Sequence, residues 1–280
     1  MGKIILSAFA DEYDKDLKAQ LNMLREQGIP MLEPRFIGEK NISVLRCEEV
    51  LAMKEQLDGI RISAIGSPLG KINLADDFAA HLELTRRVCE TANLLETPRI
   101  RVFSFYLRKG TTRAQCRGEV MDKFGQMLEV ARSFNVTLCH ENEADIYGES
   151  PEDCLDLLKN FGGEVRCVFD MGNFVLGGYE PYPHAYALLK DYIEYFHIKD
   201  ATRAGAIVPA GSGEGCITQT VREFAAETEQ EVILTLEPHL QSFNGLDKLT
   251  ERKFDNPYVY ETPQAAFVDA IGKLRAQIRT

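Results

Sequence analysis

The sequence lacks several features that would assign it to familiar classes. No apolar stretch approaches the roughly 18 residues of a membrane span, so we expect no membrane insertion. The net charge is -11 and the sequence pI is about 5.1, and no run of Lys and Arg offsets this acidity locally. Because such a surface repels phosphates, we expect no nucleic-acid partner.

Cysteine pairs and targeting signals are also missing. The seven cysteines are scattered and contain no CxxC, which is typical of a reduced cytosolic protein. The N-terminus runs directly into an apolar strand pattern without the features of a secretory signal. We therefore expect a cytoplasmic protein.

What is present is a regular alternation of strand and helix patterns. The predicted strands cover residues 3–9, 31–36, 61–66, 100–103, 136–141, 165–170, 193–198 and 231–237. Apolar residues at helical spacing fill the intervals, for example Val120, Phe124, Leu128 and Ala131, and a last helix is predicted near 263–278.

Eight such units predict an α/β protein made of a single (β/α)8 TIM barrel, with residues 1–280 as one domain. A doubly wound open sheet would also fit the alternation. That fold normally carries a Gly-rich phosphate turn after an early strand, and none follows Phe9 or Phe36. The longest irregular stretch, about 238–260, follows the eighth predicted strand.

Four consecutive predicted strands end in a polar residue: Glu141, Asp170, His197 and Glu237. Side chains alternate between the two faces of a strand, so each of these residues shares the inward face with core residues before it. The carboxyl ends of barrel strands form one rim, and the four side chains should converge there. Because a buried carboxylate is costly unless it is neutralised, we predict one divalent metal ion between them.

Three carboxylates and one imidazole are hard-to-borderline ligands. They suit a Mn, Mg or Co ion in six-fold coordination better than the tetrahedral zinc of a structural site. The predicted ion is therefore Mn, Mg, Co or a non-structural Zn. The alternative is that the four residues form salt bridges at the barrel mouth with Arg166, Lys199 or Arg203. With a metal bound, the open coordination positions should accept neutral oxygens such as water, hydroxyl or carbonyl.

Four short motifs occur in order, one on each of these strands: HENE at 140–143, FDMGN at 169–173, FHIKD at 196–200 and LEPH at 236–239. With a Gly-Ser-Gly-Glu-Gly turn at 211–215, the chain resembles the sugar phosphate isomerase/epimerase members of the xylose-isomerase-like superfamily. The resemblance covers nearly the whole chain. It implies a metal-dependent barrel that acts on a small sugar, keto-sugar or polyol.

The resemblance also implies roles for individual residues. Glu141, Asp170, His197 and Glu237 would be the metal ligands, and Glu141 and Glu237 would also move the proton. Arg203 matches an arginine that contacts substrate in ketose epimerases of this family.

The chain departs from the family pattern at two positions. Asn173 stands where a histidine is common, and an amide can bind a hydroxyl but cannot titrate. Tyr147 stands where ketose epimerases have an acidic substrate contact. These departures leave the exact substrate and stereochemistry open.

Several other residues near the predicted rim could either contact the substrate or form internal ion pairs. Lys199 and His239 are predicted substrate contacts, with a pair between Lys199 and Asp170 or Asp200 as the alternative. Glu33 and Arg35 could reach the pocket wall or form an internal salt bridge. His140 should point toward the helix layer.

The glycine turn after the seventh strand also has two readings. Gly211, Gly213 and Gly215 could offer backbone N–H groups to a phosphate, or simply turn the chain. The basic residues Lys248, Arg252 and Lys253 lie in the last long loop.

The predicted reaction is proton abstraction next to a carbonyl, through an enediolate that the metal stabilises. Two glutamates on opposite faces would give epimerisation, one base would give isomerisation, and loss of a β-hydroxyl would give an inosose dehydratase-like lyase. A non-catalytic sugar-binding barrel is a further alternative. With five histidines in the chain, a multi-zinc phosphodiesterase is disfavoured. A homo-oligomer is possible.

Overall fold

Seven strands of the computed structural model, which describes residues 1–240 and 258–278, form one parallel sheet. Their order is β1-β13-β10-β9-β8-β7-β6. The bounds are β1 (Lys3–Ala8), β6 (Ile65–Gly66), β7 (Arg99–Val102), β8 (Thr137–Glu141), β9 (Arg166–Asp170), β10 (Ile193–Ile198) and β13 (Glu231–Leu236). From β6 to β13, neighbouring strands of the sheet succeed one another along the chain. The last strand, β13, also pairs with the first strand, β1.

A short parallel pair, β2 (Met31–Leu32) and β5 (Arg61–Ile62), fills the gap between the two edges of this sheet. On one side, the Glu33 backbone N–H donates to the Ala8 carbonyl at 3.0 Å. On the other, the Gly66 N–H donates to the Pro34 carbonyl at 3.0 Å. The sheet therefore closes on itself, and the predicted TIM barrel is confirmed.

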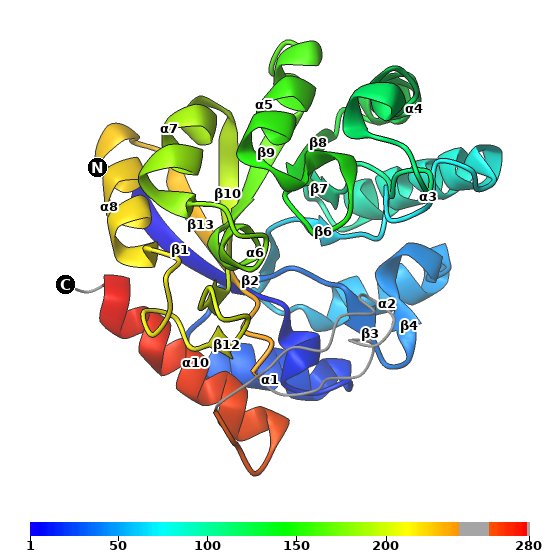
Figure 1. The fold of residues 1–280 in the computed structure, drawn as a ribbon. Helices are drawn as coiled ribbons and strands as arrows, with labels where there is room; N and C mark the ends of the chain where they lie inside the picture. The colour runs from blue at the N-terminus through cyan, green and yellow to red at the C-terminus, as the bar shows by residue number, and fades with distance from the viewer. Residues whose placement is uncertain (241–257, 279–280) are drawn as a thin grey trace.

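Helices surround the strands in a ring (Figure 1). They are α1 (Leu17–Glu26), α2 (Cys47–Gln56), α3 (Phe78–Leu94), α4 (Arg113–Ser133), α5 (Pro151–Asn160), α6 (Met171–Leu176), α7 (Tyr186–Leu189), α8 (Ile217–Glu227) and α10 (Pro263–Ile278). Side-chain hydrogen bonds cap the first turn of several helices. At the start of α4, for example, the Thr112 side chain accepts a hydrogen bond from the Gln115 N–H. The predicted apolar face of α4 is buried at Val120, Phe124 and Leu128. No helix in the described ranges is long and apolar enough to cross a bilayer.

The predicted second and third strands differ in detail from the structure. The second was expected over 31–36, but β2 ends at Leu32, two residues before Pro34, which has no N–H to continue a ladder. The third, expected over 61–66, is divided into β5 and β6. Two short antiparallel hairpins lie at the rim: β3 (Phe36–Ile37) pairs with β4 (Lys40–Asn41), and β11 (Asp200–Ala201) pairs with β12 (Ile207–Val208). Most of the predicted irregular stretch 238–260 lies outside the described residues.

The barrel interior has its own small core. It is made of Ile5, Met31, Ala64, Cys139, Val168, Tyr195 and Ile233, each at most 6% exposed. Cys139, Val168 and Tyr195 each lie two positions before a polar residue at a strand end. The predicted inward faces of β8, β9 and β10 are thus confirmed, and this core forms the floor beneath the rim.

Candidate metal centre

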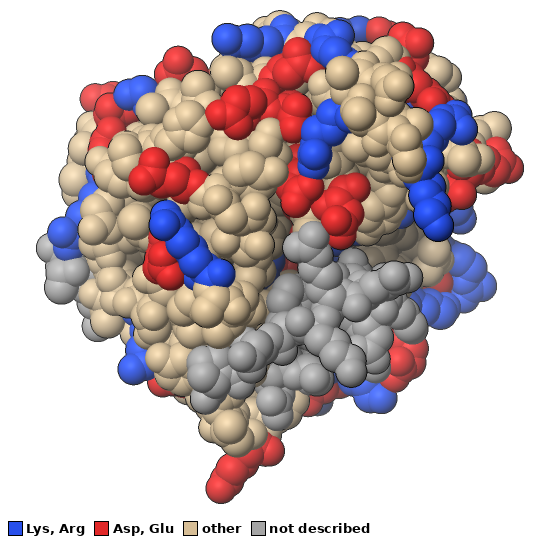
Figure 2. All heavy atoms as spheres, viewed as in Figure 1, with Lys and Arg blue, Asp and Glu red and all other residues tan. Residues whose placement is uncertain are grey.

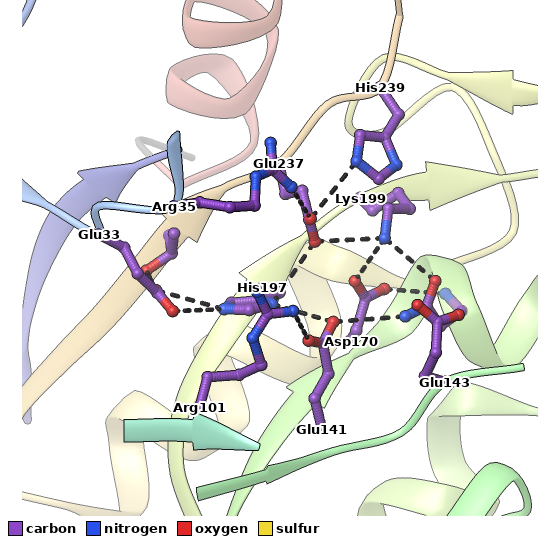
Figure 3. Close-up of polar contacts among 12 residues, drawn as sticks. Glu33, Arg35, Arg101, Glu141, Glu143, Asp170, His197, Lys199, Glu237 and His239 are labelled. Carbon is purple, nitrogen blue, oxygen red and sulfur yellow. Dashed lines mark hydrogen bonds and ion pairs between the residues drawn. The ribbon is translucent and has the colours of Figure 1, made fainter. Parts of the chain in front are cut away.

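The four polar strand ends meet at one point of the rim. Glu141, Asp170, His197 and Glu237 each offer one ligand atom, and these atoms all lie within 4.8 Å of one another. Each residue is at most 3% exposed. Figure 3 shows their side chains converging from the ends of neighbouring strands. The convergence expected from the sequence is therefore present.

Contacts on both ring nitrogens fix the orientation of His197. Its Nε2 lies 3.3 Å from both carboxylate oxygens of Glu33. Glu33 also accepts from the Tyr195 hydroxyl at 2.9 Å and the Thr235 hydroxyl at 2.8 Å. Phe9 packs edge-on against the imidazole, with ring centroids 5.0 Å apart. This arrangement turns Nδ1 of His197 toward the two glutamates.

The Nδ1 atom provides a test of whether a cation fits. It lies 3.0 Å from Glu141 Oε1 and 3.5 Å from Glu237 Oε2, buried and without a well-aligned hydrogen bond. If Nε2 carries the proton shared with Glu33, the Nδ1 lone pair faces carboxylate oxygens, which is repulsive unless a positive charge stands between them. A divalent ion at this position, held by an imidazole and carboxylates, satisfies that requirement.

Without a metal, a proton can supply the positive charge. Burial by itself would lower the pKa of His197, but the carboxylates of Glu141 and Glu33 hold that pKa well above its ordinary value. Metal and proton would therefore compete for Nδ1.

Three buried cations surround the centre (Figure 3). Arg101 Nη1 lies 2.8 Å from Glu141 Oε2, and Arg35 Nη1 lies 2.7 Å from Glu237 Oε1. Lys199 Nζ lies 3.1 Å from Asp170 Oδ2 and 3.3 Å from Glu237 Oε2. Lys199 therefore pairs with Asp170 and Glu237 rather than with Asp200.

The other two basic residues of that alternative do not reach the centre. Arg166 Nε lies 3.5 Å from Glu194, and its guanidinium donates to the backbone carbonyls of Asp191 and Ile193 near the start of β10. Arg203 has a side chain that is 63% exposed and lies 3.3 Å from Glu214. Its predicted contact with substrate remains a prediction.

The charged neighbours divide the carboxylates into two kinds. Burial would raise the pKa of Glu141, but His197 and Arg101 lower it to about 2. Burial likewise opposes ionisation of Glu237, yet Lys199 and His239 hold its pKa well below the ordinary value. For Asp170, burial outweighs the attraction of Lys199 and raises the pKa to about 7. The centre thus contains two firmly ionised glutamates and one aspartate that titrates near neutrality.

A second layer of polar residues lies beside Glu237. Asp11 and Glu12 belong to the 3-10 turn η1 (Ala10–Glu12), and Arg35 binds them at 2.9 and 3.2 Å. His239 Nε2 lies 3.4 Å from Glu12 Oε1 and 3.4 Å from Glu237 Oε1. Burial raises the pKa of Glu12 to about 8 and lowers that of His239 to about 4.

The structure also places the other predicted substrate contacts. Asn173 donates to the Asn142 carbonyl at 2.9 Å and to Glu141 Oε1 at 3.4 Å, and accepts from Lys199 at 3.0 Å. Asn173, Lys199 and His239 therefore all reach the centre.

His140 and Tyr147 both point away from the centre. His140 lies 3.0 Å from the Ser104 hydroxyl and packs against Phe124 of α4, so it points to the helix layer as expected. The Tyr147 hydroxyl donates to Asp156 of α5 at 2.6 Å, so that side chain faces away from the centre.

Sequence reasoning missed Asp11, Glu12 and Arg101. Their signals were an acidic pair directly after the first strand and an arginine inside a core strand. A buried arginine requires a buried anion as its partner.

The barrel and its rim define a class of protein: a TIM barrel with a buried carboxylate–imidazole cluster at the carboxyl ends of its strands. The chain belongs to the xylose isomerase-like TIM barrel family, whose model matches residues 21–277. A search of curated proteins finds no match.

Three solved structures illustrate the likeness of fold. A xylose isomerase-like TIM barrel protein from Mycobacterium smegmatis in complex with magnesium is 15% identical, with a TM-score of 0.68 and coverage of 100% of this chain and 97% of that one. D-psicose 3-epimerase from Clostridium cellulolyticum with D-tagatose is 13% identical, with a TM-score of 0.70 and coverage of 99% and 98%. The probable 3-DHS dehydratase AsbF from Bacillus anthracis is 18% identical, with a TM-score of 0.67 and coverage of 85% and 92%.

Proposed function

We propose that the protein is a divalent-metal-dependent sugar isomerase or epimerase that abstracts a proton next to a carbonyl. One observation carries the proposal: two ionised glutamates flank an imidazole nitrogen that needs a cation, at the rim of a barrel of this family. Similar barrels include an epimerase and a magnesium complex, which supports the same chemistry. The family match along almost the whole chain also supports a single domain.

In this proposal Glu141, Asp170, His197 through Nδ1 and Glu237 hold one Mn, Mg, Co or Zn ion. When bound, the ion supplies Lewis-acid stabilisation of the negative charge that develops on the substrate oxygens. Asp170 must lose its proton to take part, and Lys199 at 3.1 Å favours that ionised form.

Glu141 and Glu237 are the proposed acid and base. They come from β8 and from the end of β13, on two sides of His197, so they can face opposite sides of a planar intermediate. Arg101 and Arg35 keep both glutamates ionised, which is the form that accepts a proton; the glutamate that acts as the acid returns a proton only after it has taken one up from solvent. Asn173, His239, Lys199 and Arg203 are the proposed hydrogen-bond partners of the substrate hydroxyls.

Solvent deuterium exchange tests this function directly. Manganese-loaded protein in D₂O should place deuterium at the carbon next to the carbonyl of a ketose, as detected by proton NMR. Glu141→Gln and Glu237→Gln should each reduce exchange by about a hundredfold or more. Glu194→Gln, which changes a glutamate of β10 that pairs with Arg99, should leave exchange unchanged.

The same assay separates the alternatives. A dehydratase would release water and give an unsaturated or deoxygenated product. A sugar-binding barrel would bind the ketose without any exchange, and that result in metal-loaded protein would refute the proposed enzyme.

A further inference from the structure

Glu143 is a carboxylate at the rim that is not one of the four proposed metal ligands. It lies just beyond Glu141, at the carboxyl end of β8. Figure 3 shows its side chain among those of the centre, and its carboxylate interacts electrostatically with Lys199 and with Glu141. Glu143 is therefore close enough to the centre to contact a substrate that the centre holds.

Two hydrogen bonds fix the segment that carries Glu143. The Asn142 side chain accepts from the Asp170 N–H at 3.0 Å and donates to the Asp170 carbonyl at 2.9 Å. One buried amide thus pairs with both backbone groups of the last residue of β9, much as a neighbouring strand would. These bonds hold the chain after β8 against β9, so Glu143 has a fixed place relative to the proposed ligand Asp170.

Lys71 reaches Glu143 from the loop after β6. Its Nζ lies 2.9 Å from Glu143 Oε2 and 4.4 Å from the centre of the Phe103 ring. The Arg101 guanidinium lies 4.5 Å from the centre of the same ring. Lys71, Phe103 and Arg101 thus form a wall that connects the Lys71–Glu143 pair to the Arg101–Glu141 pair of the centre.

The burial of the Lys71–Glu143 pair separates it from ordinary surface pairs. On the described part of the face shown in Figure 2, basic and acidic side chains are interspersed, and exposed pairs of this kind contribute little to stability. The side chains of Lys71 and Glu143 are only 10% and 22% exposed, against 63% and 47% for Arg203 and Glu214. The pair therefore holds the Glu143 carboxylate in one place at the rim.

The Glu143 carboxylate can accept further hydrogen bonds. Among the described residues, Oε2 accepts from Lys71 and Oε1 accepts from the Ala144 N–H at 2.8 Å. The two oxygens of a carboxylate offer about four acceptor positions, so roughly half of them remain. An ionised carboxylate accepts but does not donate, and the hydroxyl of a sugar is a suitable donor for it.

We propose that Glu143 is a specificity-determining residue of the proposed enzyme, and that it accepts a hydrogen bond from a sugar hydroxyl beyond the reacting carbonyl and its neighbouring hydroxyl. Lys71 holds the carboxylate in position for this contact. The inference rests on the proposed function and adds a requirement for its substrate. Ketoses with further hydroxyls are preferred over the shortest α-hydroxy ketones because of this contact.

Deuterium exchange on two α-hydroxy ketones tests the role of Glu143. D-psicose carries further hydroxyls, whereas hydroxyacetone has only the carbonyl and one neighbouring hydroxyl. With saturating Mn²⁺, Glu143→Gln should lower kcat/KM for D-psicose by about 10–100-fold, mainly through KM, because a hydrogen bond to a charged group is lost. Exchange of hydroxyacetone should change by less than about twofold. Glu143→Asp, which withdraws the carboxylate by one methylene, should show the same selective loss and serves if the amide variant does not fold.

Glu149→Gln is the matched control. Glu149 belongs to the 3-10 turn η3 (Tyr147–Glu149) in the same loop, has a side chain that is 17% exposed and pairs with Arg113 of α4. This variant should leave the exchange of both ketones unchanged. Equal losses for D-psicose and hydroxyacetone in Glu143→Gln would mean that the Lys71–Glu143 pair only supports the fold, and would overturn the inference.

Binding of a polyol provides an arm that does not depend on turnover. D-sorbitol has a chain of hydroxyls but no carbonyl, and Mn²⁺-loaded wild-type protein should bind it about tenfold or more tightly than Glu143→Gln does, as measured by calorimetry. If no ketose exchanges but this difference is found, the proposed reaction fails while the hydroxyl contact stands. If ketoses exchange and Glu143→Gln behaves like the wild type, the inference fails while the proposed function stands. Wild-type protein that neither exchanges a ketose nor binds D-sorbitol would overturn both.

Discussion

Glu33 and His197 are 164 residues apart in the sequence, yet both carboxylate oxygens of Glu33 lie 3.3 Å from His197 Nε2. Glu33 is fully buried. A carboxylate behind a metal-binding imidazole selects its tautomer and increases its basicity. Glu33 is thus placed to direct Nδ1 of His197 toward the proposed metal, although it lies outside the proposed ligand set.

Glu33→Gln should therefore weaken metal binding by about 10–100-fold while the fold is retained. The amide keeps the size of the side chain but loses the charge that orients the imidazole. Calorimetric titration with Mn²⁺ measures the affinity, and circular dichroism checks the fold. Glu39→Gln, at a side chain that is 63% exposed, is the matched control. Wild-type affinity in Glu33→Gln would show that Glu33 has no part in positioning His197.

Metal binding should become tighter as the pH rises. In metal-free protein His197 holds a proton because its pKa is well above the ordinary value, and the pKa of Asp170 is about 7. Both groups must lose their protons to bind a metal, so a lower pH favours the competing protons. Calorimetry at pH 6, 7 and 8, in buffers with different heats of ionisation, measures affinity and proton release together. Affinity that does not change with pH, without proton release, would contradict the proposed ligands.

Arg101→Met should destabilise the protein by about 3–5 kcal/mol, because it leaves the buried carboxylate of Glu141 without its cation. Arg101 and Glu141 have side chains that are 5% and 2% exposed. Arg61→Met is the control, since its ion pair with Glu231 is 53% and 44% exposed and should contribute less than about 1 kcal/mol. Urea unfolding of metal-free protein gives both values. Equal losses in the two variants would mean that the buried pair behaves like a surface pair.

Ionisation of Glu12 should reduce the stability of metal-free protein as the pH rises. Burial raises its pKa from 4.5 to about 8, so the folded state keeps this proton after the unfolded state has lost it. Stability from this group is complete below pH 4.5 and falls as the pH approaches 8. The free energy of unfolding of the wild type, relative to Glu12→Gln, should therefore decline across this interval. Parallel pH profiles for the two proteins would mean that Glu12 ionises with an ordinary pKa.

The proposed ligands could be predicted from the sequence because their signal is local. Each is a polar residue at the end of an apolar strand, and the parallel order of β8, β9 and β10 brings such ends together. The inward faces followed from the same alternation. The glycine turn was also visible, but the sequence left it open between a phosphate site and a plain turn.

The cations around the ligands could not be predicted in the same way. Arg35 and Glu237 are 202 residues apart, and only the closure of the barrel brings them to 2.7 Å. Arg101 falls within the predicted strand 100–103, and nothing nearby in the sequence identifies its partner. For Arg203, by contrast, the sequence spacing predicts a place at the centre, and the structure puts the side chain elsewhere. Its distance from His197 in the sequence matches the family, but it lies in the turn between β11 and β12, where it is exposed.

The unequal lengths of the barrel strands have a consequence for how the molecule can change. β10 and β13 span six residues each, whereas β2, β5 and β6 span two each. Backbone amides on the long side should exchange with solvent far more slowly than those at the seam where β2 and β5 close the cylinder. Insertions and substitutions near that seam can therefore change one side of the barrel while the opposite side keeps its geometry.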